Sequence, residues 1–343
     1  MADLSIIIVN YNSADFVLAC LRSICKQKCA VAYEVIVVDN ASSERCRERL
    51  SCDYPDVVFI QSRSNLGFGK ANNLGALHSS GEVLLFLNPD TEVRGCAIEL
   101  LNEHIQKLEK PGAVGCRLLN SDGSLQTSCV QALPTVLNQL LDAEALRRWF
   151  PRSSLWGMAA LFKAGTAPAE VEAVSGACLM IQREVFDQVG GFSADYFMYG
   201  EDLDLCYKTQ QAGFRNYYVP GSVIIHHGGG STNRSVSNFS NVMMRESVYR
   251  LLLKSRGRLY SLCYRAGLSG AAVIRMALLL VIYPVWFARG NGGGWAAAFR
   301  KWFGILRWGL GLENWIRKYD QAATPAVGLK GNKENPCAGS AEN

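Results

Sequence analysis

Several acidic side chains in this chain come directly after hydrophobic runs, where they could take part in metal and phosphate chemistry. Residues 84–87 read as a strand buried on both faces, and the strand ends at Asn88-Pro89 because proline has no N–H to continue a sheet ladder. Asp90 follows this end. A carboxylate there can hold a hard divalent cation, which in turn can neutralise a diphosphate. The alternative is an Asn-Pro-Asp turn without chemistry.

Asp39 has the corresponding position one strand earlier, after the apolar run 34–38. In a sheet of parallel strands the carboxyl ends share one edge, so we expect Asp39 and Asp90 at the same edge, where open α/β sheets bind ligands. Asp39 as a simple cap of the next helix is the alternative.

A third acidic group, Glu201 and Asp202, falls at the predicted start of a helix. The helix dipole favours carboxylates there, so charge complementarity alone could explain them. His226 ends the apolar run 223–225 and precedes His227 and three glycines. A histidine at a strand end is either a hydrogen-bonded structural residue or a ligand, and both readings stay open from the residues alone.

The elements that must position these side chains alternate between strands and helices. This alternation predicts βαβ units and a mostly parallel sheet. The stretch 64–75 contains glycines that open a helix and could present N–H groups to phosphate, with Lys70 nearby. It matches neither the P-loop nor the dinucleotide-binding pattern. We expect strands at 4–9, 34–38, 57–60, 84–87, 114–119, 174–181 and 223–226, and helices at 15–28, 95–109 and from 201.

The charge of the chain is unevenly distributed. The net charge is +5, but residues 245–318 hold thirteen Lys/Arg and two acids, a net +11, so the remainder carries −6. A basic, Trp-rich segment beside a mildly acidic body predicts an anionic partner, either a membrane or a nucleic acid. The N-terminus lacks the basic and apolar regions of a secretory signal, so we expect a cytosolic chain with reduced cysteines.

Within the basic segment, residues 268–287 are apolar over about the length that spans a bilayer, but Arg275 and Pro284 interrupt them. Farther on, aromatic and aliphatic side chains recur on one helical face with basic residues off it, which is typical of a helix lying in the membrane surface. We therefore favour surface association over a membrane span or soluble packing. The apolar face comprises Trp295, Phe299, Trp302 and Leu306.

The order of these motifs resembles glycosyltransferase family 2, closest to its bacterial rhamnosyltransferase branch, over about residues 4–260. The matching strings are Ile-Ile-Val-Asn-Tyr-Asn, Val-Val-Asp-Asn-Ala-Ser, Asn-x-Gly-Phe-Gly-x-Ala-x-Asn, Leu-Asn-Pro-Asp and Glu-Asp-x-Asp-Leu-Cys. The resemblance implies an α/β GT-A fold, with a Rossmann-like, mostly parallel sheet and flanking helices. The charge and helical periodicity described above add a C-terminal helical membrane-associating segment. The resemblance also implies a nucleoside diphosphate sugar as donor and a divalent cation, Mg²⁺ or Mn²⁺, as cofactor.

The resemblance further implies roles for single residues. Asp202 would be the catalytic base, which a transferase needs because a sugar hydroxyl must lose its proton as it attacks. Glu201 would help to orient the acceptor. Asp90 and His226 would be metal ligands, although Asn88 stands where many relatives carry the first Asp of Asp-x-Asp. The nucleotide-sugar site would comprise Asn10, Asn12, Asp39 (at a uracil or thymine base), Asn65, Gly67, Lys70, Asn88 and Asp90.

These observations predict a catalytic domain over 1–245, a basic amphipathic helical segment over 246–320 and a disordered tail over 321–343. The expected activity is inverting transfer of a sugar, with rhamnose the leading candidate, from a dTDP- or UDP-linked donor to a lipid-linked or saccharide acceptor in cell-envelope polysaccharide synthesis. The expected location is the cytoplasmic face of the inner membrane, peripheral or monotopic, with no nucleic acid as partner.

Two other functions remain as alternatives. A nucleotidyltransferase would need a glycine-rich basic loop after the first strand, where residues 10–13 read Asn-Tyr-Asn-Ser. A non-catalytic membrane- or nucleic-acid-binding protein would use the +11 segment, but it leaves the carboxylates at the strand ends unexplained.

Overall fold

The computed structural model describes residues 2–27, 30–142, 144–163, 165, 167–228, 238–288 and 292–320. The tail that the sequence predicts to be disordered, 321–343, lies outside the described residues. Among the described cysteines every thiol is free, and most are buried.

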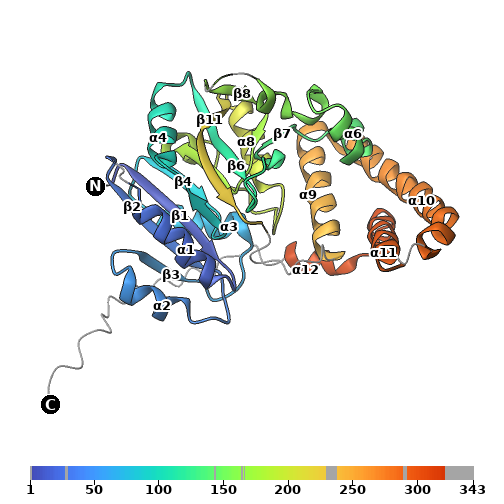
Figure 1. Ribbon diagram of the computed structural model, residues 1–343, viewed down its shortest axis with the longest axis horizontal. Helices are drawn as coiled ribbons and strands as arrows, with labels where there is room; N and C mark the ends of the chain where they lie inside the picture. Colours follow the sequence, from blue (N-terminus) through green and yellow to red (C-terminus); the bar gives the residue numbers. More distant parts are fainter. Residues whose placement is uncertain are drawn as a thin grey trace, which may run out of the picture.

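A mixed sheet forms the centre of the described molecule (Figure 1). Its order is β3-β2-β1-β4-β10-β6-β11-β5, and β8 pairs with β11 on one side. Strands β1 to β4, β6 and β11 run in one direction, and β5, β8 and β10 run in the other. The predicted α/β architecture with a mostly parallel sheet is confirmed. The strands are β1 Leu4–Asn10, β2 Tyr33–Asp39, β3 Val58–Gln61, β4 Val83–Leu87, β5 Thr91–Val93, β6 Pro111–Leu119, β8 Ala169–Val171, β10 Cys178–Gln182 and β11 Arg215–His226.

The central strands are continuous apolar runs because helices cover both of their faces. Every residue of β1 and of β4 is buried. A strand with one solvated face would show alternating polar residues instead. The helices of this part are α1 Ala14–Cys25, α2 Cys46–Asp53, α3 Phe68–Leu77, α4 Ala97–Lys107, α7 Arg183–Gln188 and α8 Glu201–Gln211.

The prediction of a single strand over 174–181 is wrong, because this stretch forms two separate strands. The segment forms β9 (Ala173–Val174), which pairs with β7 (Val130–Gln131) in a small separate sheet, and then β10, which enters the main sheet antiparallel to β4 and β6. Ser175 and Gly176 interrupt the run between the two strands. Hydrophobicity alone did not reveal this break, because both halves of the run are buried.

The stretch between β6 and β8 is built from short elements. It contains η1 Thr127–Cys129, α5 Val136–Leu140, α6 Glu144–Trp149, η2 Ser154–Trp156 and η3 Met158–Phe162. Thr135 caps α5, since its side chain accepts a hydrogen bond from Asn138 N at 3.1 Å and the Asn138 side chain accepts one from Thr135 N in return. The segment joins the small sheet to the C-terminal helices through contacts of α5 with α10.

The C-terminal helices α9 (Asn238–Arg256), α10 (Arg258–Ala288), α11 (Gly292–Gly309) and α12 (Arg317–Asp320), with the short η4 (Asn314–Ile316), gather at one end of the molecule, on the right in Figure 1. They enclose a second hydrophobic core that includes Tyr264, Ile305 and Trp308. Phe197, from the loop before α8, is part of this core. The domain boundary expected at residue 245 falls inside α9.

Candidate active site

A cavity of about 990 Å³ lies at the carboxyl ends of β1, β2 and β4. One wall comes from the sheet edge, a second from the start of α8 and a third from α5, α6, α9 and α12. The cavity therefore touches both hydrophobic cores. Of the predicted site residues, Asn65, Gly67, Asn88, Asp90, Glu201, Asp202 and His226 line it.

Asp202 is held by two backbone N–H groups. Leu203 N donates to Oδ1 and Gly176 N donates to Oδ2, both at 2.9 Å. Burial raises the pKa of Asp202, while these two hydrogen bonds work in the opposite direction by favouring the ionised form. The carboxylate is thus oriented, lines the cavity and is a stronger base than an exposed aspartate.

Glu201, the neighbouring carboxyl group, is more deeply buried. Burial, and then the charge of Asp202, raise the pKa of Glu201 to about 8. Its Oε2 is buried without a hydrogen-bond partner among the described residues. At neutral pH Glu201 therefore keeps its proton. Two adjacent carboxyl groups with separated pKa values can divide acid and base roles.

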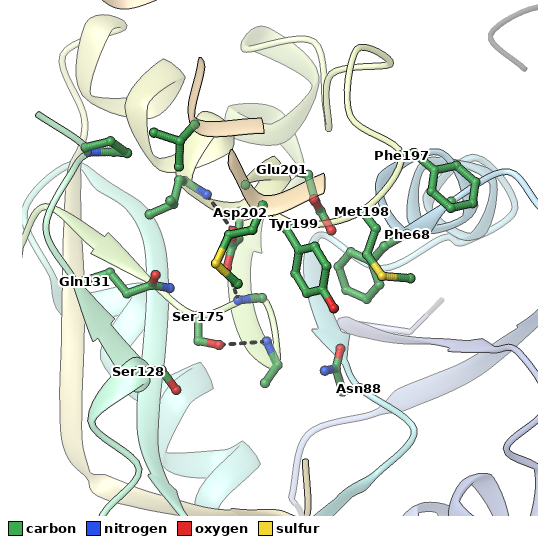
Figure 2. A pocket seen from close by; sticks show the side chains of 18 of the residues that line it. Phe68, Asn88, Ser128, Gln131, Ser175, Phe197, Met198, Tyr199, Glu201 and Asp202 are labelled. Carbon is green, nitrogen blue, oxygen red and sulfur yellow. Dashed lines mark hydrogen bonds between the residues drawn. The ribbon is translucent and has the colours of Figure 1, made fainter. Parts of the chain in front are cut away.

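The loop before α8 carries backbone strain beside the cavity. Tyr199 has φ +69°, which is unusual for a bulky side chain, and Gly200 follows at φ +79° as the cap of α8. Figure 2 shows the Tyr199 ring beside Glu201 and Asp202, extending into the cavity towards Asn88. The sequence did not identify Tyr199; a tyrosine directly before Gly-Glu-Asp was the available signal.

Gly67 makes a close backbone approach to this loop. A Cβ at Gly67 would lie 2.1 Å from the carbonyl oxygen of Phe197, and the residue has φ +79°. That carbonyl also accepts a hydrogen bond from Phe68 N at 3.0 Å. The glycine at position 67 therefore lets the start of α3 dock against the loop that delivers Glu201 and Asp202.

Helix α9 fixes the same loop from the other side. Ser247 Oγ donates to Met198 O at 3.2 Å, and Arg250 Nη1 donates to Asp195 O at 2.6 Å. Lys254 Nζ forms an ion pair of 2.7 Å with the fully buried Asp204 of α8. Pairing and hydrogen bonding are what allow a buried carboxylate to stay charged. The position of Asp202 thus depends on α9, which sequence reasoning did not connect to the site.

Asp90, His226 and Asn88 meet at the sheet edge because β5 pairs with the end of β11. Thr91 is in register with His226, and His227 N donates to Asp90 O at 2.9 Å. His226 Nε2 lies 3.3 Å from Asp90 Oδ1 and 3.3 Å from Asn88 Nδ2. The amide oxygen of Asn88 is buried without a partner among the described residues.

Gln126 determines which nitrogen of His226 carries the proton. Gln126 Nε2 donates to Asn120 Oδ1 at 3.1 Å, so its Oε1 accepts from His226 Nδ1 at 2.7 Å. In the neutral ring Nε2 then carries the lone pair, which faces Asn88 Nδ2 and the carboxylate of Asp90, each at 3.3 Å, while Nδ1 is held by Gln126. Metal-binding histidines use their second nitrogen in this way. Sequence reasoning did not single out Gln126, and no local signal marks it.

This arrangement fits a divalent cation. His226 Nε2 and Asp90 Oδ1 are 3.3 Å apart, and adjacent ligands of an octahedral ion at about 2.1 Å are about 3 Å apart, so the two atoms are spaced as neighbouring ligands of one ion. Imidazole, carboxylate and amide oxygen are suitable ligands for Mn²⁺, and the oxygens for Mg²⁺. Among the described residues no cluster of three or more His, Cys, Asp or Glu could hold a metal, so the donor would have to supply further ligands.

Asp39 and Asn10 lie next to each other but do not line the cavity. Asn10 Nδ2 donates to Asp39 Oδ1 at 2.6 Å, while Gln61 Nε2 at 2.6 Å and Ser42 N at 3.0 Å donate to Oδ2. Asn12, also outside the lining, accepts from Ser43 N at 2.8 Å. These side chains brace the loops that follow β1 and β2.

Asn40, which sequence reasoning missed, ties the 65–67 loop to the end of β2. Its Nδ2 donates to Asn65 Oδ1 at 3.0 Å, and its Oδ1 accepts from Leu66 N at 2.8 Å. Asn65 in turn accepts from Gly67 N at 2.9 Å. Lys70 lies in α3 and does not line the cavity.

Comparison with known proteins adds independent information. The family model described as Glycosyl transferase family 2 matches residues 5–190, and a second, Glycosyl transferase family group 2, matches residues 144–308. The chain is 30% identical to N-acetylglucosaminyl-diphospho-decaprenol L-rhamnosyltransferase of Mycobacterium tuberculosis over 259 residues, which is 72% of this chain and 83% of that protein. It is 25% identical to rhamnosyltransferase WbbL of Escherichia coli K12, covering 73% of this chain and 93% of WbbL.

Solved structures share the fold. The mannosyltransferase PcManGT of Pyrobaculum calidifontis, determined with GDP-Man and Mn²⁺, matches with a TM-score of 0.52 at 16% identity, over 91% of this chain and 87% of that one. GalNAc-T7, determined with UDP, GalNAc and Mn²⁺, matches with a TM-score of 0.54 at 19% identity, over 74% of this chain and 48% of that one. The family-model match covers more than half of the chain and agrees with the predicted resemblance, so this protein belongs to glycosyltransferase family 2.

Proposed function

We propose that this glycosyltransferase moves a sugar, with inversion, from a dTDP- or UDP-linked donor to a lipid-linked saccharide in cell-envelope polysaccharide synthesis. One observation carries the proposal: the oriented Asp202 carboxylate and the Asp90–His226 pair line the same cavity. A base for the acceptor and a charged site for the leaving diphosphate are the two requirements of such a transfer.

In the proposed reaction an acceptor hydroxyl attacks the anomeric carbon of the donor sugar. Its proton passes to Asp202 as the new carbon–oxygen bond forms, and the bond to the nucleoside diphosphate breaks. A single displacement of this kind inverts the anomeric centre. Glu201, protonated and next to Asp202 in the chain, keeps a second negative charge away from the base and helps to orient the acceptor.

Asp90 and His226, with the amide oxygen of Asn88, are proposed to hold the divalent cation. When bound, the cation would neutralise charge that develops on the leaving diphosphate. The chain's own contribution is the orientation of these groups, through Gln126 at His226 and through the β5–β11 pairing at Asp90.

The nucleotide is proposed to lie along Asn65, Gly67 and the ends of β1 and β2. A carboxylate can accept about four hydrogen bonds, and Asp39 already accepts three, from Asn10, Ser42 and Gln61. The imide N–H of a pyrimidine base would take the remaining position. Asn10 and Asn12 would support the site by bracing the loops that follow β1 and β2, and Lys70 would act from α3 without lining the cavity.

The choice of rhamnose and of a lipid-linked acceptor rests on the relatives. Two of them are named as rhamnosyltransferases, and the Mycobacterium tuberculosis protein is named for an N-acetylglucosaminyl-diphospho-decaprenol acceptor. A lipid-linked acceptor also suits the exposed apolar surface of α10.

Association with the cytoplasmic membrane face is proposed for the C-terminal helices. Among the described residues one helical segment, Arg258–Pro284, is long and apolar enough to cross a membrane, with a mean hydropathy of 1.9 over its most apolar 18 residues. Its side chains are largely exposed, with Val281 77% and Ile274 63% exposed. Exposed apolar surface of this size, joined to a net charge of +11 over 245–318, favours a helix lying in an anionic membrane surface.

Nucleotide binding tests the donor site. We expect dTDP or UDP, but not GDP or CMP, to bind in the presence of Mn²⁺ or Mg²⁺, and chelation or Asp90→Asn to weaken that binding about tenfold or more. Asp187→Asn, an exposed acid of α7, is the matched control and keeps wild-type affinity. The proposal is contradicted if GDP or CMP binds while dTDP and UDP do not, or if dTDP binds equally well without a metal.

A further inference from the structure

Basic side chains from four helices meet beside the cavity wall that faces the C-terminal helices. Arg147 of α6 and Arg245 of α9 line the cavity. Arg275 of α10 and Lys301 of α11 contact the same indole ring, with Arg275 Cζ 4.2 Å and Lys301 Nζ 5.5 Å from the centre of Trp302. The cations therefore continue from the cavity towards α10 and α11.

Contacts with α5 join the two pairs of cations. Arg245 Nη1 donates to Gln139 Oε1 at 3.2 Å, and Arg275 Nη2 donates to the carbonyl of the next residue, Leu140, at 3.5 Å. Arg245 and Arg275 thus flank one turn of α5. We call Arg245, Arg275 and Lys301 the basic triad.

Among the described residues no member of the basic triad forms an ion pair with an acid. Asp142, the acid that acts on both Arg275 and Lys301, already forms an ion pair of 2.7 Å with Arg147. Burial, and then the charge of Arg245, lower the pKa of both Arg275 and Lys301. Repulsion between partly desolvated cations costs stability, which a bound anion would recover.

We propose that the basic triad binds the diphosphate of a polyprenyl-diphosphate-linked acceptor, and this inference rests on the proposed function. In such an acceptor the diphosphate adjoins the sugar, so a site beside the cavity of Asp202 has the required position. Arginine side chains bind phosphate oxygens in bidentate fashion, which suits Arg245 and Arg275. The prenyl chain would follow the exposed apolar side chains farther along α10, which include Leu278, Val281 and Ile282.

Head groups of anionic phospholipids carry the same phosphate chemistry and are the other possible source. The placement favours the acceptor, because Arg245 lines the cavity rather than the exposed helix surface. A site for bulk lipid would need its cations on the outer faces of α10 and α11, as at the exposed Arg300.

Binding of farnesyl diphosphate in neutral detergent micelles tests the inference. We expect Arg245→Gln or Arg275→Gln to weaken its Kd about tenfold or more, and the triple variant with Lys301→Gln to weaken it further. Arg300→Gln, an exposed cation of α11, is the matched control and keeps wild-type affinity. Farnesol, which lacks phosphate, binds wild type and the triple variant equally. The Kd of the nucleoside diphosphate is unchanged in every variant, which shows that the fold is intact.

Two outcomes overturn the inference. One is an unchanged farnesyl diphosphate Kd in a triple variant that still binds nucleotide. The other is a triple variant that keeps farnesyl diphosphate binding but loses binding to phosphatidylglycerol vesicles, which assigns the triad to lipid head groups. Failure of the proposed function is distinguishable, since it appears as absence of nucleotide binding in the wild type.

Discussion

The backbone N–H of Gly176 donates a 2.9 Å hydrogen bond to Asp202 Oδ2. This contact joins the break between β9 and β10 to the first turn of α8, which lies 26 residues farther along the chain. The interruption of the apolar run at Ser175-Gly176 is thus part of the site, because a continuous strand would use this N–H in its ladder. The strand break and the orientation of the proposed base have one structural cause.

Replacing the proposed base tests its role. Asp202→Asn keeps the shape of the side chain but removes the proton acceptor, so we expect kcat to fall about 10²- to 10⁴-fold. The Kd of the nucleoside diphosphate should change little, because the hydrogen bonds of Asp202 go to Gly176 and Leu203 and not to Asp90 or His226. Steady-state transfer assays and nucleotide titration measure the two quantities, with Asp187→Asn as control. A fall in kcat below tenfold contradicts the assignment.

Gly176→Ala tests the orientation of Asp202 without changing its chemistry. An added Cβ would lie 3.2 Å from Asp202 Cβ, closer than an ordinary contact, so the carboxylate must move by a few tenths of an ångström. We expect kcat to fall about tenfold, since small misplacements of a catalytic group are costly. At Gly221 a Cβ meets no atom within 4 Å, so Gly221→Ala is the control. Equal kcat values in the two variants argue against this role of Gly176.

The buried proton of Glu201 makes stability depend on pH. Its pKa is about 8, against an ordinary value of 4.5, so the folded state holds a proton that the unfolded state releases. The free energy of unfolding therefore falls as the pH rises from 4.5 to about 8, by a few kcal/mol at most. Glu201→Gln should flatten this fall. Urea unfolding at pH 5, 7 and 9 measures it, and parallel curves for both proteins would refute the prediction.

Gln126→Leu tests the support of the proposed metal site. Without the acceptor at Nδ1, His226 can rotate or change tautomer, so we expect metal-dependent nucleotide affinity to fall about tenfold to a hundredfold. Nucleotide binding in EDTA should not change, which separates this effect from general damage. Calorimetric titration with Mn²⁺ and then nucleotide measures both. Gln131→Leu, which removes an amide from the cavity wall without touching His226, is the control.

Gly67→Ala tests the docking of α3 against the loop before α8. The added Cβ would lie 2.1 Å from Phe197 O, and φ +79° strains any L residue other than glycine. We expect a loss of about 3 kcal/mol or more in the free energy of unfolding. Gly190→Ala has a similar positive φ of +75° but open space around the Cβ, so it isolates the backbone strain. Equal losses in the two variants would show that the contact with Phe197 adds nothing.

The sequence by itself determined the fold class and the family. Apolar runs that end at Asn10, Asp39, Asn88 and His226 are local patterns, and hydrophobic burial with proline and glycine breaks acts within a few residues. The same locality explains why the start of α8 at Glu201 was predicted from its acids. Family motifs are likewise short strings that need no tertiary information.

Only the tertiary structure decided which residues face each other across the site. The contact of Gln126 with His226 spans 100 positions, and α9 reaches back from Lys254 to Asp204 over 50. No local pattern encodes such pairs, because they result from the packing of elements that are far apart in the chain. The basic triad has the same origin. In the sequence its members are three of thirteen scattered Lys and Arg residues over 245–318, and the packing of α9, α10 and α11 brings them together.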